Sequence, residues 1–222
     1  MCRRDSLLAV SRRVTLTDYT EMLLPEERDG KIVTFFLGSH VHADRIYPHI
    51  LPHIRREVRF ILGPSGATML GQCSFVWIHP YKFFGEGITI LTPQNLSGIL
   101  HLTKEYISQN RNICLMGDFL DTVLSNIEFK PAYNFILSYT SLIKVSKSFT
   151  ILFVTSDILS EDKYNIVRRF SDFVVDVKIK PDEQNRLGTW FKVYDVYQDR
   201  ILRIKLGDSS PPVSPEDKEG NQ

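Results

Sequence analysis

The stretch KIVTFFLG, residues 31–38, is an apolar run bounded by glycines, with almost no polar residue inside it. A strand with one wet face alternates apolar and polar residues, so this run predicts a strand buried on both faces of a sheet. Further runs of this kind recur along the chain: VRFILG (58–63), CSFVWIHP (73–80), NICLMGD (112–118), FTILFVTSD (149–157) and DFVVDVKI (172–179).

Segments with helical spacing separate these runs. The clearest begins at Asn95 or Ser97, either of which is a candidate N-terminal cap, and it carries apolar residues at helical intervals through Ile107. Strands that alternate with helices are typical of a mainly parallel sheet covered on both faces. The closing stretch, residues 189–207, reads as two strands that turn at Gln198-Asp199. The sequence therefore predicts a three-layer α/β fold with a C-terminal antiparallel hairpin.

Composition indicates an ordinary globular protein of 222 residues, 43% hydrophobic and 24% charged. The formal net charge of +1 predicts no general attraction to nucleic acid or to an anionic membrane. Three distant cysteines form no disulfide or metal spacing, which favours a reducing, cytoplasmic setting. No apolar run approaches the roughly 20 residues of a membrane helix. We expect residues 1–29 to form an N-terminal segment, 30–206 the folded domain and 207–222 a disordered tail.

The glycine-rich stretch GPSGATMLGQC, residues 63–73, has the outline of a phosphate-binding loop. Gln72 stands where such a loop has its lysine, and Cys73 stands where it has serine or threonine. A β-type run follows directly and leaves little room for a helix, so we interpret this stretch as a turn. In this fold a phosphate-binding loop would instead lie between a strand and a helix, as does GSHVHADR, residues 38–45. There Gly38, Ser39 and Arg45 are the candidate phosphate contacts.

The order of the later segments resembles a known group of ATPases. ICLMGD ends in an acid, as does the strand that holds the magnesium-linked aspartate in RecA and KaiC-type ATPases, and the closing hairpin with Arg200, Arg203 and Lys205 is also similar. Residues 75–143 further resemble the archaeal domain of unknown function 835 group, through Trp77-Ile78, the helix start PQNL (93–96), LMGDFL (115–120) and NIEF (126–129). The resemblance implies a RecA-like sheet with a degenerate nucleotide site, an archaeal origin and no assigned reaction. Gly117 and Asp118 stand in swapped order relative to that pattern.

Two strand ends supply candidate site residues at the carboxyl edge of the sheet, where open α/β folds bind ligands. Asp118 is either a relic of a magnesium site or a cap for the following turn, with Asp121 on the surface. Ser156 and Asp157 end the next long strand, where they either contact a γ-phosphate or cap a helix.

His40 and His42 follow a buried strand with the spacing that metal-dependent amidohydrolases use on their first strand. A barrel hydrolase needs about 250 residues and further ligands on later strands, which argues for exposed histidines without a metal.

Three functions follow from these observations. The first is a non-catalytic RecA-like regulatory or protein-interaction domain in archaeal signalling, with a protein partner or self-association and no cofactor. The second is a nucleotide-binding protein or weak ATPase that holds ATP and magnesium with Gly38, Ser39, Arg45, Asp118, Ser156 and Asp157. The third is a metal-dependent hydrolase that uses His40 and His42. The first is preferred because the fold pattern is present without the phosphate-loop lysine.

Overall fold

The structure is a computed structural model that describes residues 29–38, 41–43, 46–63, 75–78, 89–110, 112–181, 187–195 and 200–205. The predicted N-terminal segment up to residue 28, the glycine-rich stretch from residue 64 to 73 and the predicted tail lie outside the described residues. In the described part of the chain, no helix is long and apolar enough to cross a membrane.

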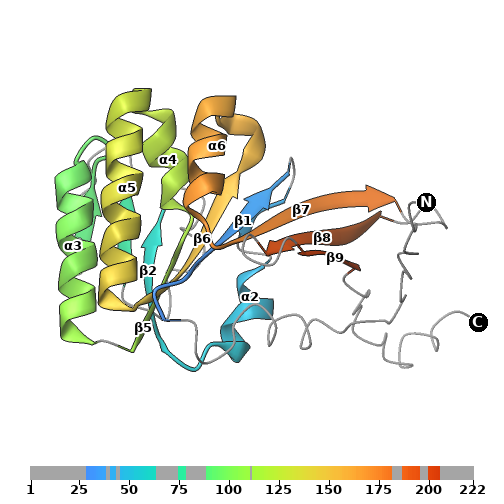
Figure 1. The fold of residues 1–222 in the computed structure, drawn as a ribbon, viewed down its shortest axis with the longest axis horizontal. Helices are drawn as coiled ribbons and strands as arrows, with labels where there is room; N and C mark the ends of the chain where they lie inside the picture. Colours follow the sequence, from blue (N-terminus) through green and yellow to red (C-terminus); the bar gives the residue numbers. More distant parts are fainter. Residues whose placement is uncertain are drawn as a thin grey trace, which may run out of the picture.

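Nine strands in the described part form one sheet in the order β4-β3-β2-β5-β6-β1-β7-β8-β9 (Figure 1). From β4 to β7 all neighbours are parallel, and β7, β8 and β9 pair antiparallel. This arrangement confirms the predicted mainly parallel sheet with a closing antiparallel hairpin. The strands are β1 (Ile32–Leu37), β2 (Glu57–Leu62), β3 (Phe75–Ile78), β4 (Thr89–Leu91), β5 (Ile113–Gly117), β6 (Phe149–Thr155), β7 (Phe173–Pro181), β8 (Leu187–Asp195) and β9 (Arg200–Lys205).

Helices cover the two faces of this sheet unequally. The short α2 (Tyr47–Ile50) and the 3-10 turn η2 (Leu51–His53) pack on one face. The other face carries α3 (Leu96–Gln109), α4 (Phe119–Ser125), α5 (Phe129–Ser146) and α6 (Glu161–Phe170), seen together in Figure 1. The three layers confirm the predicted architecture.

The central strand β1 contributes to two hydrophobic cores. Val33, Phe35 and Leu37 belong to the core under α2, where the Tyr47 ring meets Phe153 edge-on with centroids 4.8 Å apart. Ile32 and Phe36 belong to the core under the four larger helices. All six residues of β1 are buried, so the apolar run correctly predicted burial on both faces.

Local features explain the start of α3 and the end of α5. The Asn95 side chain accepts a hydrogen bond of 3.0 Å from the Gly98 amide, which selects Asn95 rather than Ser97 as the cap of α3. The C-terminal cap of α5 is Lys147, whose backbone is left-handed with a φ of 58°. The helical segment after β1 consists of one turn of α-helix followed by η2, because Pro52 lacks the amide hydrogen that a continuing α-helix needs.

Candidate functional site

The strand order creates a topological switch point between β1 and β6. After β1 the chain passes to the face of α2, whereas after β6 it passes to α6 on the opposite face. Connections that leave in opposite directions open a crevice outside the carboxyl ends of two neighbouring strands, where ligands bind in folds of this class. The candidate site is therefore the edge formed by the ends of β1, β6 and the neighbouring β5.

Asp118 follows β5 at this edge and is only 3% exposed. Its Oδ1 atom accepts a hydrogen bond of 2.7 Å from the amide of Gly63, at the end of β2. Asp118 occupies the N-terminal cap position of α4 but makes no capping bond with its side chain. The interpretation of Asp118 as a cap is therefore wrong, and its carboxylate instead joins the ends of two parallel strands.

Two glycines allow this close contact between β2 and β5. A Cβ atom added at Gly117 would lie 1.7 Å from the carbonyl oxygen of Ile61, which is far inside contact distance. A Cβ atom at Gly63 would lie 3.0 Å from both the Asp118 carbonyl oxygen and the Thr122 hydroxyl. Any side chain at Gly117 would push the strand ends apart and move Asp118 away from its partner.

Asp121, one turn further along α4, binds the end of the next strand. Both of its carboxylate oxygens lie 2.9 Å from the amide nitrogen of Thr155, the last residue of β6. Burial raises the pKa of Asp121 to about 7. The bonds from Thr155 lower this pKa by a smaller amount, and the negative charge of the nearby Asp118 raises it further. The expectation that Asp121 lies on the surface is wrong, because α4 turns its carboxyl group toward the sheet.

A hydroxyl spans the switch point itself. The Oγ atom of Ser156 lies 3.1 Å from the carbonyl oxygen of Leu37 and 3.1 Å from a carboxylate oxygen of Asp157. On the other side of β1, the Gly38 amide donates a hydrogen bond of 2.9 Å to the Val177 carbonyl of β7. The ends of β6, β1 and β7 are thus joined to one another by groups that the nucleotide hypothesis assigned to a ligand.

The sequence-predicted residues divide into two groups. Gly38, Asp118, Ser156 and Asp157 lie at or beside the carboxyl ends of β1, β5 and β6. Ser39, His40 and Arg45 lie outside the described residues, and His42 is exposed. Among the described residues, no group of three or more His, Cys, Asp or Glu side chains is placed to hold a metal ion.

Three of the described amides after β1 are bonded within the chain. The Gly38 amide is bonded to Val177, the Val41 amide to the Gly38 carbonyl at 3.1 Å, and the Ile46 amide to the Ala43 carbonyl at 2.9 Å. The helix that follows, α2, has only four residues, too few for a substantial helix dipole. The Oδ1 atom of Asp118 is already the acceptor of the Gly63 amide. In the described part of this edge, several groups that could contact a phosphate or a magnesium ion are thus already bonded within the chain.

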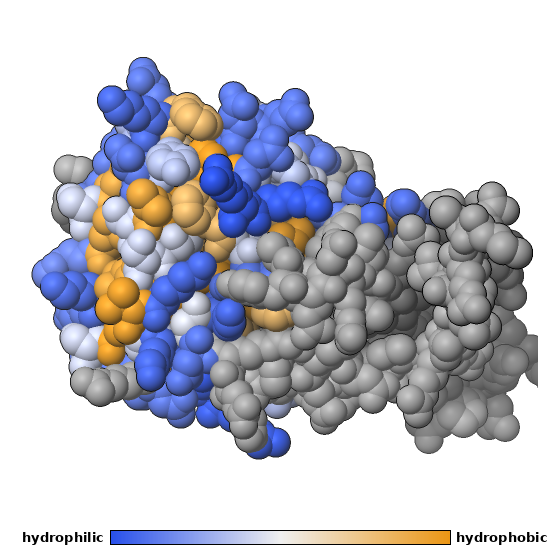
Figure 2. Space-filling view, viewed as in Figure 1, coloured by the Kyte–Doolittle hydropathy of each residue, from blue (hydrophilic) through white to orange (hydrophobic). Residues whose placement is uncertain are grey.

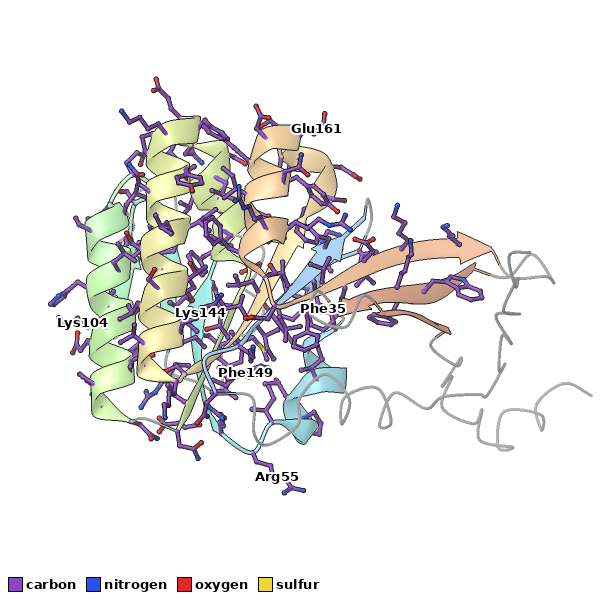
Figure 3. The ribbon with its side chains drawn as sticks, in the orientation of Figure 1. Phe35, Arg55, Lys104, Lys144, Phe149 and Glu161 are labelled. Atoms are coloured by element: carbon purple, nitrogen blue, oxygen red, sulfur yellow. The ribbon has the colours of Figure 1, made fainter. Side chains whose placement is uncertain are left out.

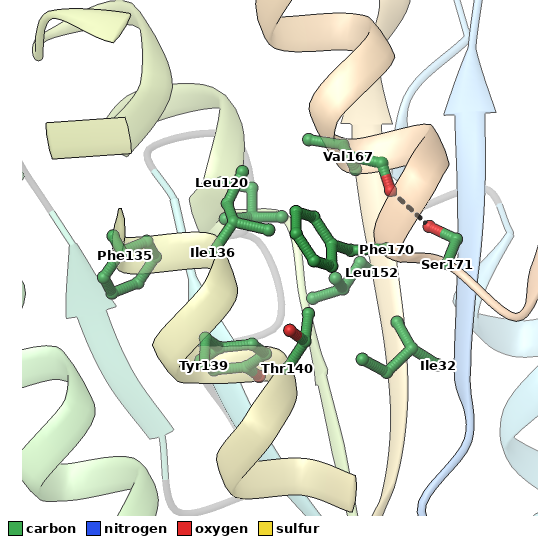
Figure 4. A pocket seen from close by; sticks show the side chains of 10 residues that line it. All are labelled: Ile32, Leu120, Phe135, Ile136, Tyr139, Thr140, Leu152, Val167, Phe170 and Ser171. Atoms are coloured by element: carbon green, nitrogen blue, oxygen red, sulfur yellow. Dashed lines mark hydrogen bonds between the residues drawn. The ribbon is translucent and has the colours of Figure 1, made fainter. Parts of the chain in front are cut away.

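A small cavity elsewhere in the molecule does not provide a second site. It lies between α5, α6 and the sheet, and its wall is almost entirely apolar (Figure 4). The Ser171 hydroxyl at its rim is bonded to the Val167 carbonyl at 2.7 Å. Its volume of about 10 Å³ is that of a single water molecule at most, so it has no room for an organic ligand.

Sequence reasoning missed a further contact that holds this edge in place. The Lys163 ammonium of α6 donates hydrogen bonds to the carbonyl oxygens of Leu124 and Ile127, the second at 2.6 Å. Leu124 lies in the last turn of α4 and Ile127 two residues beyond its end, where a cation also interacts favourably with the helix dipole. No local sequence pattern could have indicated that Lys163 binds these carbonyls, because they are 36 or more residues away along the chain.

Comparisons with known proteins bear on the fold. No family model matches the chain, and no curated protein matches its sequence. Among solved structures, the chain is similar to a KaiC-like protein, PH0186, from the hyperthermophilic archaeon Pyrococcus horikoshii OT3, with a TM-score of 0.55 and 13% identity over 80% of this chain and 84% of that one. A second protein from the same organism, solved as Project ID PH0250, has a TM-score of 0.54 and 11% identity over 71% of this chain and 86% of that one. The fold is therefore a RecA-like α/β fold.

Proposed function

We propose that this chain is a non-catalytic RecA-like domain that acts as a regulatory or protein-interaction module. The observation that carries the proposal is the engagement of Asp118, Asp121 and Ser156 with the backbone of neighbouring strand ends. A ligand that took over these groups would compete with bonds that hold the strand ends together. Leaving a buried amide without its acceptor costs about 1–3 kcal/mol for each group. The predicted setting in archaeal signalling and the resemblance to the unknown-function group remain predictions.

The outer surface of α5 supports the interaction part of the proposal. Leu137 is 41% exposed and Val145 is 85% exposed. At about 100° per residue these two positions lie about 80° apart around the helix, with the exposed Ser141 between them. Figure 2 shows hydrophobic side chains over α5 and α3 on this face. This helix surface also carries the exposed Lys130 and Lys144. Its exposed apolar side chains suit contact with another protein or with a second copy of the chain.

Nucleotide binding is the direct test of the non-catalytic assignment. Fluorescent ATP with magnesium is titrated into the wild-type protein, and the melting temperature is recorded with and without millimolar ATP. We expect no saturable binding and no stabilisation. A ligand present at a hundred times its dissociation constant would add about 2.7 kcal/mol, which for a chain of this size raises the melting temperature by several degrees.

A matched pair of variants gives that titration its control. Asp157 lies at the candidate edge and Asp162 on α6, and both are exposed acids. If ATP binds, and binding weakens in Asp157→Asn but not in Asp162→Asn, the edge is a nucleotide site and the proposal of a non-catalytic module is wrong. This outcome would promote the nucleotide-binding alternative, which the switch-point topology favours.

Self-association tests the interaction surface. Sedimentation velocity over a concentration series should show wild-type species heavier than a monomer, because the apolar side chains of α5 are covered in the complex. The double variant Leu137→Lys with Val145→Lys should stay monomeric, since two buried charges would oppose association. Ser108→Lys with Gln109→Lys, exposed on α3, is the control and should sediment as the wild type does. A wild-type chain that is monomeric at every concentration counts against self-association.

A further inference from the structure

The antiparallel end of the sheet gathers positive charge on one of its faces. Residues directly opposite each other in antiparallel strands lie on the same face, as do alternate residues along one strand. Lys178 of β7 is opposite Trp190 of β8, and Asp176 is opposite Lys192. Lys180 lies two residues beyond Lys178 on the same strand. We call this side of β7, β8 and β9 the ribbon face.

The two sides of the ribbon differ sharply in burial. Val177 and Phe191 point into the core under α2 and are at most 2% exposed. On the ribbon face, Lys178 and Lys180 are exposed and form no ion pair within the described part of the chain. The ribbon extends past α6 in Figure 1, and nitrogen-tipped side chains rise from β7 on this side in Figure 3. The helical layer therefore does not cover these lysines.

The register of β9 continues the same face. Lys205 is the partner of Trp190, and Arg203 is the partner of Lys192. Within the described strands β7, β8 and β9, five basic positions thus share one face with one acidic position, Asp176. The formal net charge of +1 conceals this concentration, because acids elsewhere in the chain balance it. A local field of one sign attracts an oppositely charged partner whatever the total charge of the protein is.

We propose that the ribbon face binds an extended acidic segment of a partner protein. The inference rests on the proposed role as a protein-interaction module and names the chemistry of the partner. Lys178 and Lys180 are separated by two residues of a strand, about 6.6–6.8 Å. An extended peptide with an acid at every second residue presents carboxylates at the same interval. The partner segment therefore matches the lysines of β7 in both sign and spacing, and the half-buried Trp190 lies opposite Lys178 on the same face.

Nucleic acid fits this face less well. Every nucleotide of a nucleic acid strand carries a phosphate, so a strand crossing the face would bring a phosphate against Asp176. A major groove about 12 Å wide admits two strands of a ribbon, whereas this face is three strands wide. An acidic peptide is less densely charged and can place a neutral residue beside Asp176. These features favour the peptide.

The test uses a fluorescein-labelled ten-residue peptide of alternating Glu and Ser, titrated into the full chain and followed by anisotropy. We expect binding at 50 mM salt that weakens clearly at 200 mM, because the contacts are ionic and exposed. The double variant Lys178→Glu with Lys180→Glu should lose at least about tenfold in affinity. The control, Lys104→Glu with Lys147→Glu, makes the same charge change on exposed residues outside the ribbon and should stay within about twofold of the wild type. Circular dichroism and thermal melts confirm that both variants fold.

Two results would overturn the proposal. If the ribbon variant and the control lose the same affinity for the peptide, binding depends only on the overall charge of the protein. Tighter binding of a ten-nucleotide thymidine oligomer, abolished by the ribbon variant, would make the face a nucleic-acid site. Neither result tests the proposed function, because the ATP titration and the sedimentation experiment do not involve the ribbon lysines. Failure of the inference and failure of the proposed function are therefore distinguishable.

Discussion

Two aspartates at opposite ends of the parallel strands hold the sheet in different ways. Asp172 lies at the amino edge, 1% exposed, where its Oδ2 atom accepts a hydrogen bond of 2.8 Å from the Ile32 amide. Its Oδ1 atom lies 3.5 Å from the Lys31 ammonium and 3.9 Å from that of Lys144. Asp121, at the carboxyl edge, contacts the Thr155 amide with both oxygens.

The difference lies in what compensates the negative charge. At the amino edge, two lysines and an amide share the charge of Asp172. At the carboxyl edge, the described contacts of Asp121 include no cation, so burial raises the pKa of Asp121 to about 7. A backbone amide is a weaker partner for a carboxylate than an ammonium group is. The amino edge is therefore held by charge pairing, and the strength of the carboxyl edge depends on pH.

The largest effect should come from breaking the amino edge. Asp172→Ala leaves the Ile32 amide without its acceptor and should lower the free energy of unfolding by about 3 kcal/mol, as measured in urea at pH 7. Asp172→Asn offers an oxygen to that amide and should lose less. The exposed Asp162→Ala on α6 is the control, with an expected change within about 1 kcal/mol. If Asp172→Ala costs no more than this control, charge pairing at the amino edge is not a source of stability.

A smaller effect should distinguish the carboxyl edge by its pH dependence. The folded state binds the proton of Asp121 more tightly than the unfolded state, because its pKa is raised from 3.8 to about 7. The contribution of Asp121 to stability is therefore full below about pH 4 and is lost as pH rises to about 7. Asp121→Asn removes this titration and keeps an oxygen for the Thr155 amide.

The measurement compares urea unfolding of the wild type and Asp121→Asn at pH 5 and pH 7.5. The difference in unfolding free energy between the two proteins should change by about 2 kcal/mol, with the variant gaining on the wild type at pH 7.5. Other groups titrate equally in both proteins, so their contributions cancel. Two pH curves that run parallel would show that Asp121 titrates near its usual pKa, and the contrast between the edges would not hold.

Much of the fold could be predicted, but the partners of the site residues could not. The apolar runs located most strands, and the Asn95 cap located the start of α3. The seven-residue α4 was not predicted, since it is too short to show a helical period. Asp118 was a correct candidate for the carboxyl edge, but its partner Gly63 is 55 residues away. No local pattern links such residues, because the contact depends on β2 and β5 becoming neighbours.

The sequence by itself determined the class of the fold, the burial of the central strands on both faces and the alternation of strands with helices. These features follow from local periodicity, which each segment carries independently of the others. Only the tertiary structure decided that Asp121 reaches Thr155 and that lysines of β7 and β8 share one face of the ribbon. Strand order and register set these contacts, and both come from packing between segments that are distant along the chain.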